Sequence, residues 1–379
     1  MRTFKRILIG LFLFLGLGVA LLYIFDADYI LKGIRIIYLK GYTSVYIDDY
    51  PHFDNRKIES GKTQEWPIHK NYNKFSATKK LQETHKELGT IAFLIIKNDS
   101  IWYENYAEDY GKTSKTNSFS MAKSITSALL GKAIQDGYIK NLDQPVADFF
   151  PQFDKRLTVG DLSSMASGLN WDENYYNPFS MTARIYLDDD IREFLLSLKV
   201  VEKPGEEFTY LSGNTALLAM VIEKATQKKL SNYLSESFWQ PLGMQTSALW
   251  QLDSKKSGLE KAYCCIASNA RDFAKFGKLY SNFGNWNGKQ LLDSSFVKKS
   301  IEPRFKESPQ YGYGFWLSNF KGKEIFSMRG ILGQYVIGIP EDNLIIVRLG
   351  HKRQARPEGK KFPADFYTYI EESYKMLQN

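Results

Sequence analysis

An uncharged, apolar segment lies near the N-terminus of the chain. Ile7–Phe25 contains no charged side chain, and acidic residues follow directly at Asp26 and Asp28. As a helix this segment would be about 28 Å long, close to the roughly 30 Å hydrocarbon core of a bilayer. Basic residues precede it at Arg2, Lys5 and Arg6. Positive charge before the segment and negative charge after it predict a cytoplasmic N-terminus, with the rest of the chain outside.

This segment has two interpretations. A cleaved signal peptide would use the small residues Gly18-Val19-Ala20 as its cleavage site, but Leu21–Phe25 continues the apolar run beyond them. We therefore expect residues 1–25 to form a short cytoplasmic stub and an uncleaved signal anchor. The protein would then be a single-pass protein of the cytoplasmic (inner) membrane. Either interpretation places the remainder on the periplasmic or extracytoplasmic side.

Residues 26–87 mix aromatic, charged and turn-forming residues without a long periodic element. We expect a linker or N-terminal extension here, followed by one folded domain over residues 88–379. Within the extension, Tyr29–Leu39 is amphipathic. Such a segment either lies on the membrane surface or packs on the main domain, and the pattern favours the two equally.

The folded domain begins with strand patterns and continues with helical ones. Ile91–Lys97 and Ser100–Tyr106 are rich in apolar, β-branched and aromatic residues, and Asn98-Asp99 predicts a hairpin turn between them. In residues 117–137 apolar residues recur at helical spacing, and Gly137 ends the element. Further helices are predicted at Ile191–Leu198, Thr215–Ala225 and Ala270–Tyr280.

The C-terminal part returns to strands and ends in an amphipathic helix over Pro363–Leu377. The predicted strands are Tyr313–Leu317, Ile325–Arg329, Gln334–Ile339 and Leu344–Leu349. The turn at residues 340–343 joins the last two as a hairpin. Strands from both ends around a helical middle predict an α+β fold, in which an antiparallel sheet is flanked by helices and carries an inserted, mainly helical region.

Composition narrows the classes of function. The chain has 379 residues and a formal net charge of +8, but its basic residues are scattered, without a zinc-finger, RNP-like or basic-helix pattern. We therefore expect no nucleic-acid partner. The two cysteines, Cys264 and Cys265, are sequence neighbours, and neighbours rarely bridge each other, so we expect core packing from them. No Cys-x-x-Cys or His-x-x-x-His pattern accompanies them, and no metal site is predicted.

Ser-x-x-Lys is the catalytic pattern that best fits the predicted elements. A Ser-His-Asp site is weakly supported, because the sequence has no Gly-x-Ser-x-Gly motif and only four histidines. Ser-x-x-Lys occurs at Ser76/Lys79, Ser120/Lys123, Ser295/Lys298 and Ser318/Lys321. Only Ser120 stands at the start of a long apolar helix, with Lys123 on the same face one turn later. The plain alternative is an N-cap serine beside a solvated lysine.

Burial would make Lys123 a useful base. A free lysine, with a pKa near 10.4, is a poor base at neutral pH, and desolvation lowers that pKa because it disfavours the charged form. The helix N-terminus favours negative charge that develops near Ser120. Ser120 is therefore a candidate nucleophile, and Lys123 is its candidate partner.

Two further segments supply candidate groups. In residues 204–214 (PGEEFTYLSGN), Tyr210 precedes a predicted helix on a loop, from which its hydroxyl could relay a proton. In residues 327–334 (SMRGILGQ), a glycine-bearing strand would let a substrate approach the backbone. The backbone N–H groups of Ser120 and Ile331 would then form an oxyanion hole. The plain alternatives are a core tyrosine and a β-bulge.

These motifs, in this order, resemble those of the class C β-lactamase-like serine hydrolases, a family that also includes DD-peptidases, esterases and nylon-oligomer hydrolases. The similarity spans about residues 88–350 and includes Ser120-Met-Ala-Lys123 and Tyr210-Leu-Ser212. The resemblance implies a nucleophile at Ser120, its partner at Lys123 and the acid–base tyrosine at Tyr210, without metal or cofactor. It implies substrate contacts from Tyr175, in a lid-like loop, and from Ser212, Asn214, Arg329 and Gly330.

The sequence departs from the family pattern at two motifs. Ser212 replaces the asparagine of Tyr-x-Asn, and the Tyr-x-Ser-x-Asn form with Asn214 is similar to that of the nylon-hydrolase and esterase branch. Met328-Arg329 replaces the Lys/His-Thr pair of the third motif. That lysine or histidine helps to hold the carboxylate of a β-lactam or peptide, so the change puts antibiotic hydrolysis in doubt.

We therefore predict hydrolysis of an ester or amide bond in a small-molecule or peptide-like substrate. The reaction would pass through an acyl-enzyme on Ser120, with Lys123 and Tyr210 as the acid–base pair. A DD-peptidase or β-lactamase is the alternative among enzymes. A non-hydrolytic cell-envelope binding or sensor protein is the alternative from another class.

Overall fold

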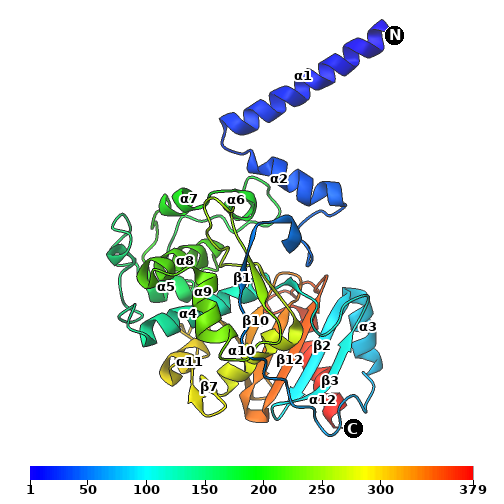
Figure 1. Cartoon of the computed structure of the whole chain (residues 1–379), viewed down its shortest axis with the longest axis vertical. Coiled ribbons are helices and arrows are strands. Elements are labelled where there is room, and N and C mark those ends of the chain that lie inside the picture. The colour runs from blue at the N-terminus through cyan, green and yellow to red at the C-terminus, as the bar shows by residue number, and fades with distance from the viewer. Residues whose placement is uncertain (379) are drawn as a thin grey trace.

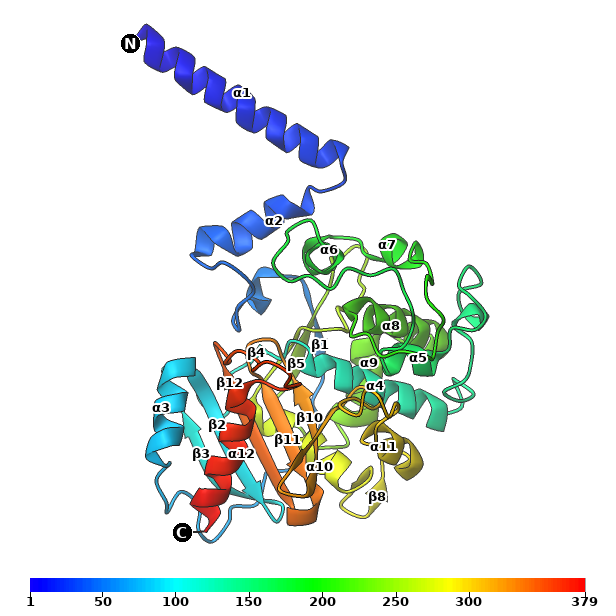
Figure 2. The same ribbon diagram turned by 180° about the vertical axis from the view of Figure 1, so that it is seen from behind.

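The computed structural model describes residues 1–378 of the chain. Its most isolated element is α1 (Arg2–Ile24), which projects away from the body of the molecule (Figures 1 and 2). α1 is exposed along nearly its whole length and is apolar enough to be a membrane span or a signal sequence. The apolar N-terminal helix predicted from the sequence is thus confirmed.

The body is organised around a six-stranded antiparallel sheet in the order β3-β2-β12-β11-β10-β9. The strands are β2 (Thr90–Lys97), β3 (Ser100–Tyr106), β9 (Trp316–Phe320), β10 (Lys323–Arg329), β11 (Tyr335–Ile339) and β12 (Leu344–Gly350). β2 pairs with β12, with Leu94 opposite Val347. Both ends of the domain therefore meet in one sheet, as predicted. β9 begins later than predicted, after a turn at Gly314 (φ 84°).

Helices cover both faces of this sheet. Along β2, Phe93 and Ile95 belong to one apolar cluster, whereas Leu94 and Ile96 belong to the other. Helices α3 (Lys79–Leu88) and α12 (Ala364–Leu377) cover the first face (Figure 2). Helix α10 (Ala270–Ser281) packs on β11 and β12 from the second (Figure 1). Because both faces are covered, the central strands β2, β11 and β12 are mostly apolar, although β12 also carries the buried Arg348.

A mainly helical region lies beside the sheet, as predicted. Its centre is formed by α4 (Met121–Gln135) and α8 (Ser212–Thr226), which pack on each other. The smaller helices are α5 (Val159–Ser163), α6 (Met181–Leu187), α7 (Arg192–Leu196), α9 (Leu230–Leu234) and α11 (Ser294–Ser300). α8 begins at Ser212 rather than at the predicted Thr215, because Leu211, with extended backbone, is its N-cap. Ser212 therefore lies in a first helical turn.

A second sheet goes beyond the sequence prediction. It has four strands in the order β1-β5-β6-β4. These are β1 (Asn55–Ile58), β5 (Ala248–Gln251), β6 (Ile266–Ser268) and β4 (Thr116–Asn117), and a separate ribbon pairs β7 (Asn285–Trp286) with β8 (Lys289–Gln290). Strands this short are too brief for alternation to be recognised in a sequence.

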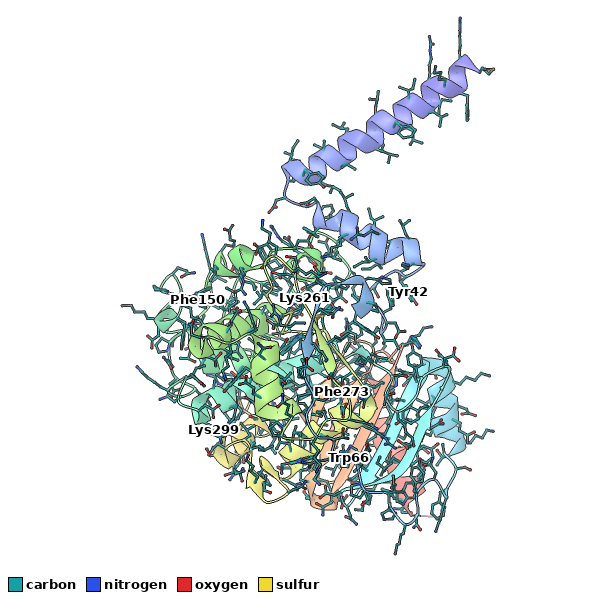
Figure 3. The ribbon with its side chains drawn as sticks, viewed as in Figure 1. Tyr42, Trp66, Phe150, Lys261, Phe273 and Lys299 are labelled. Atoms are coloured by element: carbon teal, nitrogen blue, oxygen red, sulfur yellow. A yellow bond between two sulfur atoms is a disulfide. The ribbon has the colours of Figure 1, made fainter. Side chains whose placement is uncertain are left out.

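Residues 26–87, expected as a linker or N-terminal extension, pack onto the body. Its strand β1 belongs to the second sheet, and its helix α3 packs on one face of the six-stranded sheet. Trp66, labelled in Figure 3, is buried. Its indole N–H donates to the carbonyl of Arg271 (2.9 Å). α2 (Tyr29–Ile36) rests on α6, where an added Cβ on Gly33 would lie 2.8 Å from Leu187 Cδ1. Of the two interpretations of Tyr29–Leu39, packing on the main domain is the one observed.

The neighbouring cysteines correct one expectation. Cys264 and Cys265 are both buried, but they are joined by a disulfide instead of packing as two separate thiols. Cys265 has left-handed backbone (φ 79°), so the chain turns sharply between the two residues.

Candidate active site

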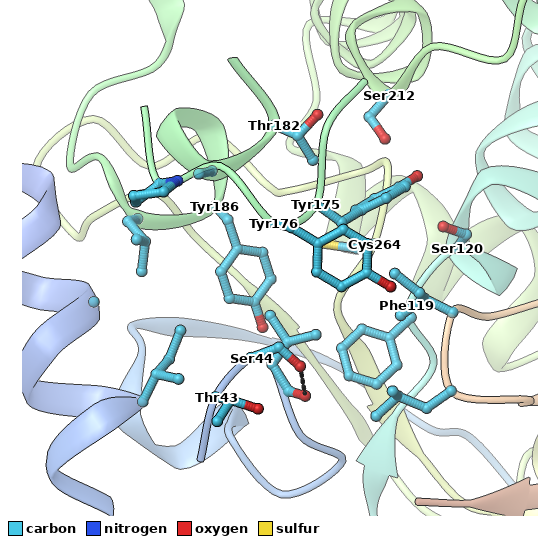
Figure 4. A pocket seen from close by; sticks show the side chains of 18 of the residues that line it. Thr43, Ser44, Phe119, Ser120, Tyr175, Tyr176, Thr182, Tyr186, Ser212 and Cys264 are labelled. Carbon is cyan, nitrogen blue, oxygen red and sulfur yellow. Dashed lines mark hydrogen bonds between the residues drawn. The ribbon is translucent and has the colours of Figure 1, made fainter. Parts of the chain in front are cut away.

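Ser120 lies at a turn between the second sheet and α4. β4 pairs with β6 just before this turn. Phe119 has left-handed backbone (φ 45°), and α4 begins at Met121, directly after Ser120. Left-handed backbone is uncommon for a bulky residue and persists only where the surroundings hold it. The turn leaves Ser120 half-buried on the wall of a cavity (Figure 4).

A buried polar network supports this turn. Asn117 Oδ1 accepts from the Phe119 N–H (2.9 Å), and Asn117 Nδ2 donates to Asp49 Oδ1 (2.9 Å). Asp49 also accepts from the Tyr186 hydroxyl. Burial raises the pKa of Asp49 to about 6, against the opposing hydrogen bonds. Sequence reasoning missed Asp49, because a single carboxylate in an unpatterned extension gives no signal of its partner.

Lys123 reaches back to Ser120 from the first turn of α4. Its Nζ donates to Ser120 Oγ (3.1 Å), to Ser212 Oγ (3.1 Å) and to the carbonyl of Tyr263 (2.8 Å). Lys123 is only 3% exposed. Burial lowers its pKa to about 8, while the negative charge of Glu173 opposes the shift. An amine of this kind is partly neutral near pH 7 and can accept a proton.

Burial distinguishes Lys123 from the lysines of the other three Ser-x-x-Lys matches. Lys79, Lys298 and Lys321 are all exposed. Their side chains are in contact with solvent, whereas Lys123 is enclosed by protein.

Tyr210 approaches the same point from the loop before α8. Lys123 Nζ lies 5.1 Å from the centroid of the Tyr210 ring. The ring packs on those of Trp316 and Tyr311, with centroid separations of 5.2 Å and 6.0 Å. Burial raises the pKa of Tyr210, and hydrogen bonding by the Ser120 side chain opposes that rise. The structure thus brings the phenol of Tyr210, from a distant part of the chain, close to the neighbouring hydroxyl of Ser120 and amine of Lys123.

Two backbone N–H groups near Ser120 have no acceptor. Within residues 1–378, the N–H groups of Ser120 and Ile331 donate to no protein atom, and both residues line the cavity. Gly330 lets the strand end approach the Ser120 turn, because an added Cβ would lie 2.8 Å from the Ser118 carbonyl oxygen and 2.5 Å from Gln334 Oε1. Such free N–H groups are available to an oxygen that becomes negatively charged.

Glu173 connects the lid-like loop to Lys123. Its carboxylate accepts from the backbone N–H of Ser212 (2.7 Å), from Ser212 Oγ (2.7 Å) and from Trp171 Nε1 (2.7 Å). It also accepts from the hydroxyl of Tyr175. Because Ser212 Oγ accepts from Lys123, a chain of hydrogen bonds joins the amine to the carboxylate. Sequence reasoning missed Glu173, although the WDEN segment beside Tyr175 contains it.

Two of the predicted substrate-binding side chains lie away from the cavity. Asn214 is buried in α8, where its Oδ1 accepts from Ser167 Oγ. The Arg329 guanidinium lies over the rings of Trp316 (4.3 Å) and Phe362 (4.5 Å), and burial lowers its pKa to about 10. Among the described residues, the lining of the cavity includes neither of these side chains, and it also includes neither Lys123 nor Tyr210.

The cavity beside Ser120 has a volume of about 550 Å³ (Figure 4). Tyr175 and Ser212, both predicted to contact substrate, line it. Cys264 also lines it, next to the Tyr263 carbonyl that holds Lys123. Within residues 1–378, no group of three or more His, Cys, Asp or Glu side chains is placed to hold a metal ion.

The antiparallel sheet, the adjoining helical region and the helix-borne serine–lysine pair define a hydrolase of the β-lactamase type. The chain belongs to the Beta-lactamase family, whose model matches residues 77–368. It is 24% identical over 296 residues to 6-aminohexanoate-dimer hydrolase from Paenarthrobacter ureafaciens. The aligned region covers 71% of this chain and 74% of that protein. The family resemblance predicted from the motifs is confirmed.

Solved structures share the fold. A Bacillus anthracis protein assigned as a 6-aminohexanoate-dimer hydrolase has a TM-score of 0.72 at 22% identity, covering 87% of this chain and 91% of that one. A Bacteroides dorei protein assigned as a β-lactamase has a TM-score of 0.64 at 19% identity, covering 79% of this chain and 97% of that one. The predicted α+β class is therefore confirmed.

Proposed function

We propose that the protein is a serine hydrolase that cleaves an ester or amide bond through an acyl-enzyme on Ser120. The observation that carries the proposal is the 3.1 Å contact between Lys123 Nζ and Ser120 Oγ, made by a buried amine with a pKa of about 8. A hydroxyl beside a base of this kind is an activated nucleophile. Membership of the Beta-lactamase family and similarity to 6-aminohexanoate-dimer hydrolase support this class of reaction.

In the proposed reaction, neutral Lys123 takes the Ser120 proton as Oγ bonds to the carbonyl carbon of the substrate. The N–H groups of Ser120 and Ile331 stabilise the negatively charged oxygen. The bond to the leaving oxygen or nitrogen then breaks, and that atom takes the proton from Lys123 through Tyr210. A water molecule next gives a proton to Lys123, and its oxygen adds to the acyl carbon. The bond between that carbon and Ser120 Oγ then breaks, which releases the acid, and Lys123 returns the proton to Ser120.

The two acid–base groups have different roles in this scheme. Burial lowers the pKa of Lys123 to about 8 but raises the pKa of Tyr210 above its ordinary value. Lys123 is therefore the primary base, since it reaches its reactive neutral form near pH 7. Tyr210 stays protonated and passes a proton between Lys123 and the leaving group.

We assign the remaining predicted residues by position. Tyr175 and Ser212 contact the substrate, because both line the cavity. Gly330 allows the reacting carbonyl to approach the backbone of Ile331. Arg329 acts indirectly, by packing over Trp316, which in turn packs on Tyr210.

We further propose that residues 1–25 form a cytoplasmic stub and a signal anchor in the inner membrane. The hydrolase domain, with residues 26–87 as its N-terminal extension, would then lie on the periplasmic or extracytoplasmic side. Basic residues before α1 and acidic residues after it support this orientation. The Cys264–Cys265 disulfide fits an oxidising compartment.

Replacement of the nucleophile tests the proposal in the full chain. Ser120→Ala should abolish both turnover of p-nitrophenyl acetate and labelling by a fluorophosphonate probe. Ser76→Ala is the matched control, because Ser76 belongs to a Ser-x-x-Lys match whose lysine is exposed. It should label and turn over like the unchanged protein, and circular dichroism should show that both variants are folded. Undiminished labelling of Ser120→Ala would overturn the assignment.

Further assays of the same protein distinguish the alternative functions. Turnover of nitrocefin or of a D-Ala-D-Ala peptide would indicate a β-lactamase or a DD-peptidase. Met328 stands at the position of the lysine or histidine that holds the carboxylate in the family motif, and this replacement argues against such substrates. A burst of one product equivalent without steady-state turnover would indicate a binding or sensor protein.

A further inference from the structure

The helix that follows α1 forms one wall of the cavity that contains Ser120. α2 and the residue pair after it contribute Ile30, Gly33, Ile37 and Tyr38 to the lining. Figure 4 shows this helical wall across the cavity from Ser120. Ser120 and the helix next to α1 therefore line the same cavity.

This wall lies close to the end of α1. Residues 25–28 alone separate Ile24, where α1 ends, from Tyr29, where α2 begins. Four residues span at most about 14 Å. With α1 in a membrane, as proposed above, α2 and the cavity wall that it forms are held near the bilayer surface.

The rim of the cavity on this side exposes large apolar side chains. The lid-like loop touches α2, because the Tyr29 hydroxyl donates to the carbonyl of Pro178 (3.2 Å). The large apolar side chains more than a third exposed on the lid-like loop, on α2 and on the two positions 38 and 39 after it are Ile34 (40%), Tyr38 (54%), Leu39 (76%), Tyr175 (41%), Tyr176 (90%) and Phe179 (66%). Exposed apolar groups gathered on one surface mark a site of interaction, and a bilayer accepts such groups.

The charged side chains that line the cavity are basic, whereas Asp26 and Asp28 before α2 and Glu173 of the lid-like loop lie outside the lining. Arg35 and Lys40 are exposed in and after α2, and Lys352 and Arg353 line the cavity from the loop after β12. Arg353 Nε donates to the carbonyl of Ile331 (2.8 Å), which places a cation beside the proposed oxyanion hole. Among residues 1–378, no side chain that lines the cavity is acidic. The cavity therefore favours an anionic ligand.

We propose that the substrate is an amphiphilic ester or amide taken from the membrane surface. Its acyl chain lies along the α2 wall, its carbonyl lies at Ser120, and its anionic head group lies near Lys352 and Arg353. This inference rests on the proposed function of Ser120. The volume of about 550 Å³ lies within the range of pockets that enclose small ligands. The head group leaves with the proton delivered through Tyr210, and water then releases the acyl chain as a free acid.

The first arm of the test varies acyl length. The full chain, in nanodiscs, is assayed with acetyl and dodecanoyl p-nitrophenyl esters, and kcat/KM should be at least about tenfold higher for the longer ester. Tyr38→Ser should lower the dodecanoyl-to-acetyl ratio of kcat/KM at least severalfold, and Ile30→Ser provides a second variant of the same wall. Ile68→Ser is the matched control, because Ile68 is 55% exposed and lies outside the cavity lining.

The second arm varies the head group and its source. Vesicles of phosphatidylcholine containing a minor fraction of a lysophospholipid with a glycerophosphate or a phosphocholine head supply the substrate. The anionic head should be preferred, and Lys352→Glu should remove that preference. Lys360→Glu, in the exposed part of the same loop, is the control and should retain it.

The outcomes separate the two proposals. Ser120-dependent turnover that is independent of acyl length would overturn the amphiphile inference and leave the hydrolase assignment standing. Turnover of monomeric dodecanoyl ester with none of vesicle-borne lipid would overturn the membrane source. Absence of both turnover and fluorophosphonate labelling would overturn the hydrolase assignment itself.

Discussion

The pH dependence of turnover tests the role of Lys123 directly. With its pKa lowered to about 8, about one amine in eleven is neutral at pH 7. With the ordinary value of 10.5, about one in 3,000 would be neutral, so burial enriches the reactive form about 300-fold. Because each pH unit well below the pKa removes about tenfold of the neutral amine, kcat/KM should fall about tenfold from pH 7 to pH 6 and level off above about pH 9.

The assay is kcat/KM for p-nitrophenyl acetate between about pH 6 and about pH 9, with spontaneous hydrolysis subtracted. Glu173→Gln supplies the second measurement. The negative charge of Glu173 raises the pKa of Lys123, so its removal should move the acidic limb of the profile to lower pH. Glu83→Gln, an exposed glutamate on α3, is the matched control. A flat profile, or a limb that moves to higher pH in Glu173→Gln, would refute the assignment of Lys123 as the base.

Three further predictions concern stability and geometry. Lys123→Met should abolish turnover. It should also raise the free energy of unfolding at pH 7 by on the order of 2 kcal/mol, because the lowered pKa of Lys123 costs the folded state about 3 kcal/mol and the lost hydrogen bonds offset part of that gain. Since the folded pKa of Lys123 lies below the unfolded one, stability of the unchanged protein should rise between about pH 8 and the ordinary 10.5, and urea titrations of Lys123→Met should lack that rise. Gly330→Ala should lower kcat at least about tenfold, since the new Cβ displaces the Ser118 turn, whereas Gly111→Ala, with nothing within 4 Å of its Cβ, should leave kcat unchanged. Asp49→Ala should lower the free energy of unfolding by about 2 kcal/mol, because Asn117 and Tyr186 both lose their buried acceptor and this loss exceeds the gain from removing a carboxylate whose pKa is raised. Unchanged urea midpoints would contradict this.

Several features of the molecule could be predicted from local patterns. The β2–β3 hairpin shows as two apolar runs around Asn98-Asp99, and α10 shows as a helical period. Ser120 and Lys123 are also a local feature, because a helix places residues three apart on one face. Tyr210 is a candidate from its place on a loop before a predicted helix, and the motif resemblance implies its acid–base role, but nothing local in the sequence indicates its contact with Lys123.

Other features arise only from contacts between distant segments. Asp49 supports the Ser120 turn through Asn117, and Glu173 reaches Lys123 through Ser212. Each is a single polar side chain without periodicity, so neither can be assigned a partner from its neighbours in sequence. Arg329 likewise stands at the threonine position of the family's Lys/His-Thr-Gly motif, and packing places its guanidinium over aromatic rings.

The difference between the features that the sequence predicts and those that only the structure shows has a physical cause. Backbone geometry and the alternation of apolar residues act over a few positions, so they specify the apolar N-terminal helix, the main strands and the serine–lysine spacing. Burial, by contrast, is a property of the folded body. It lowers the pKa of Lys123 because α8 and the Tyr263 segment exclude water around it, and it makes α2 a wall of the cavity because Gly33 lets that helix settle on α6.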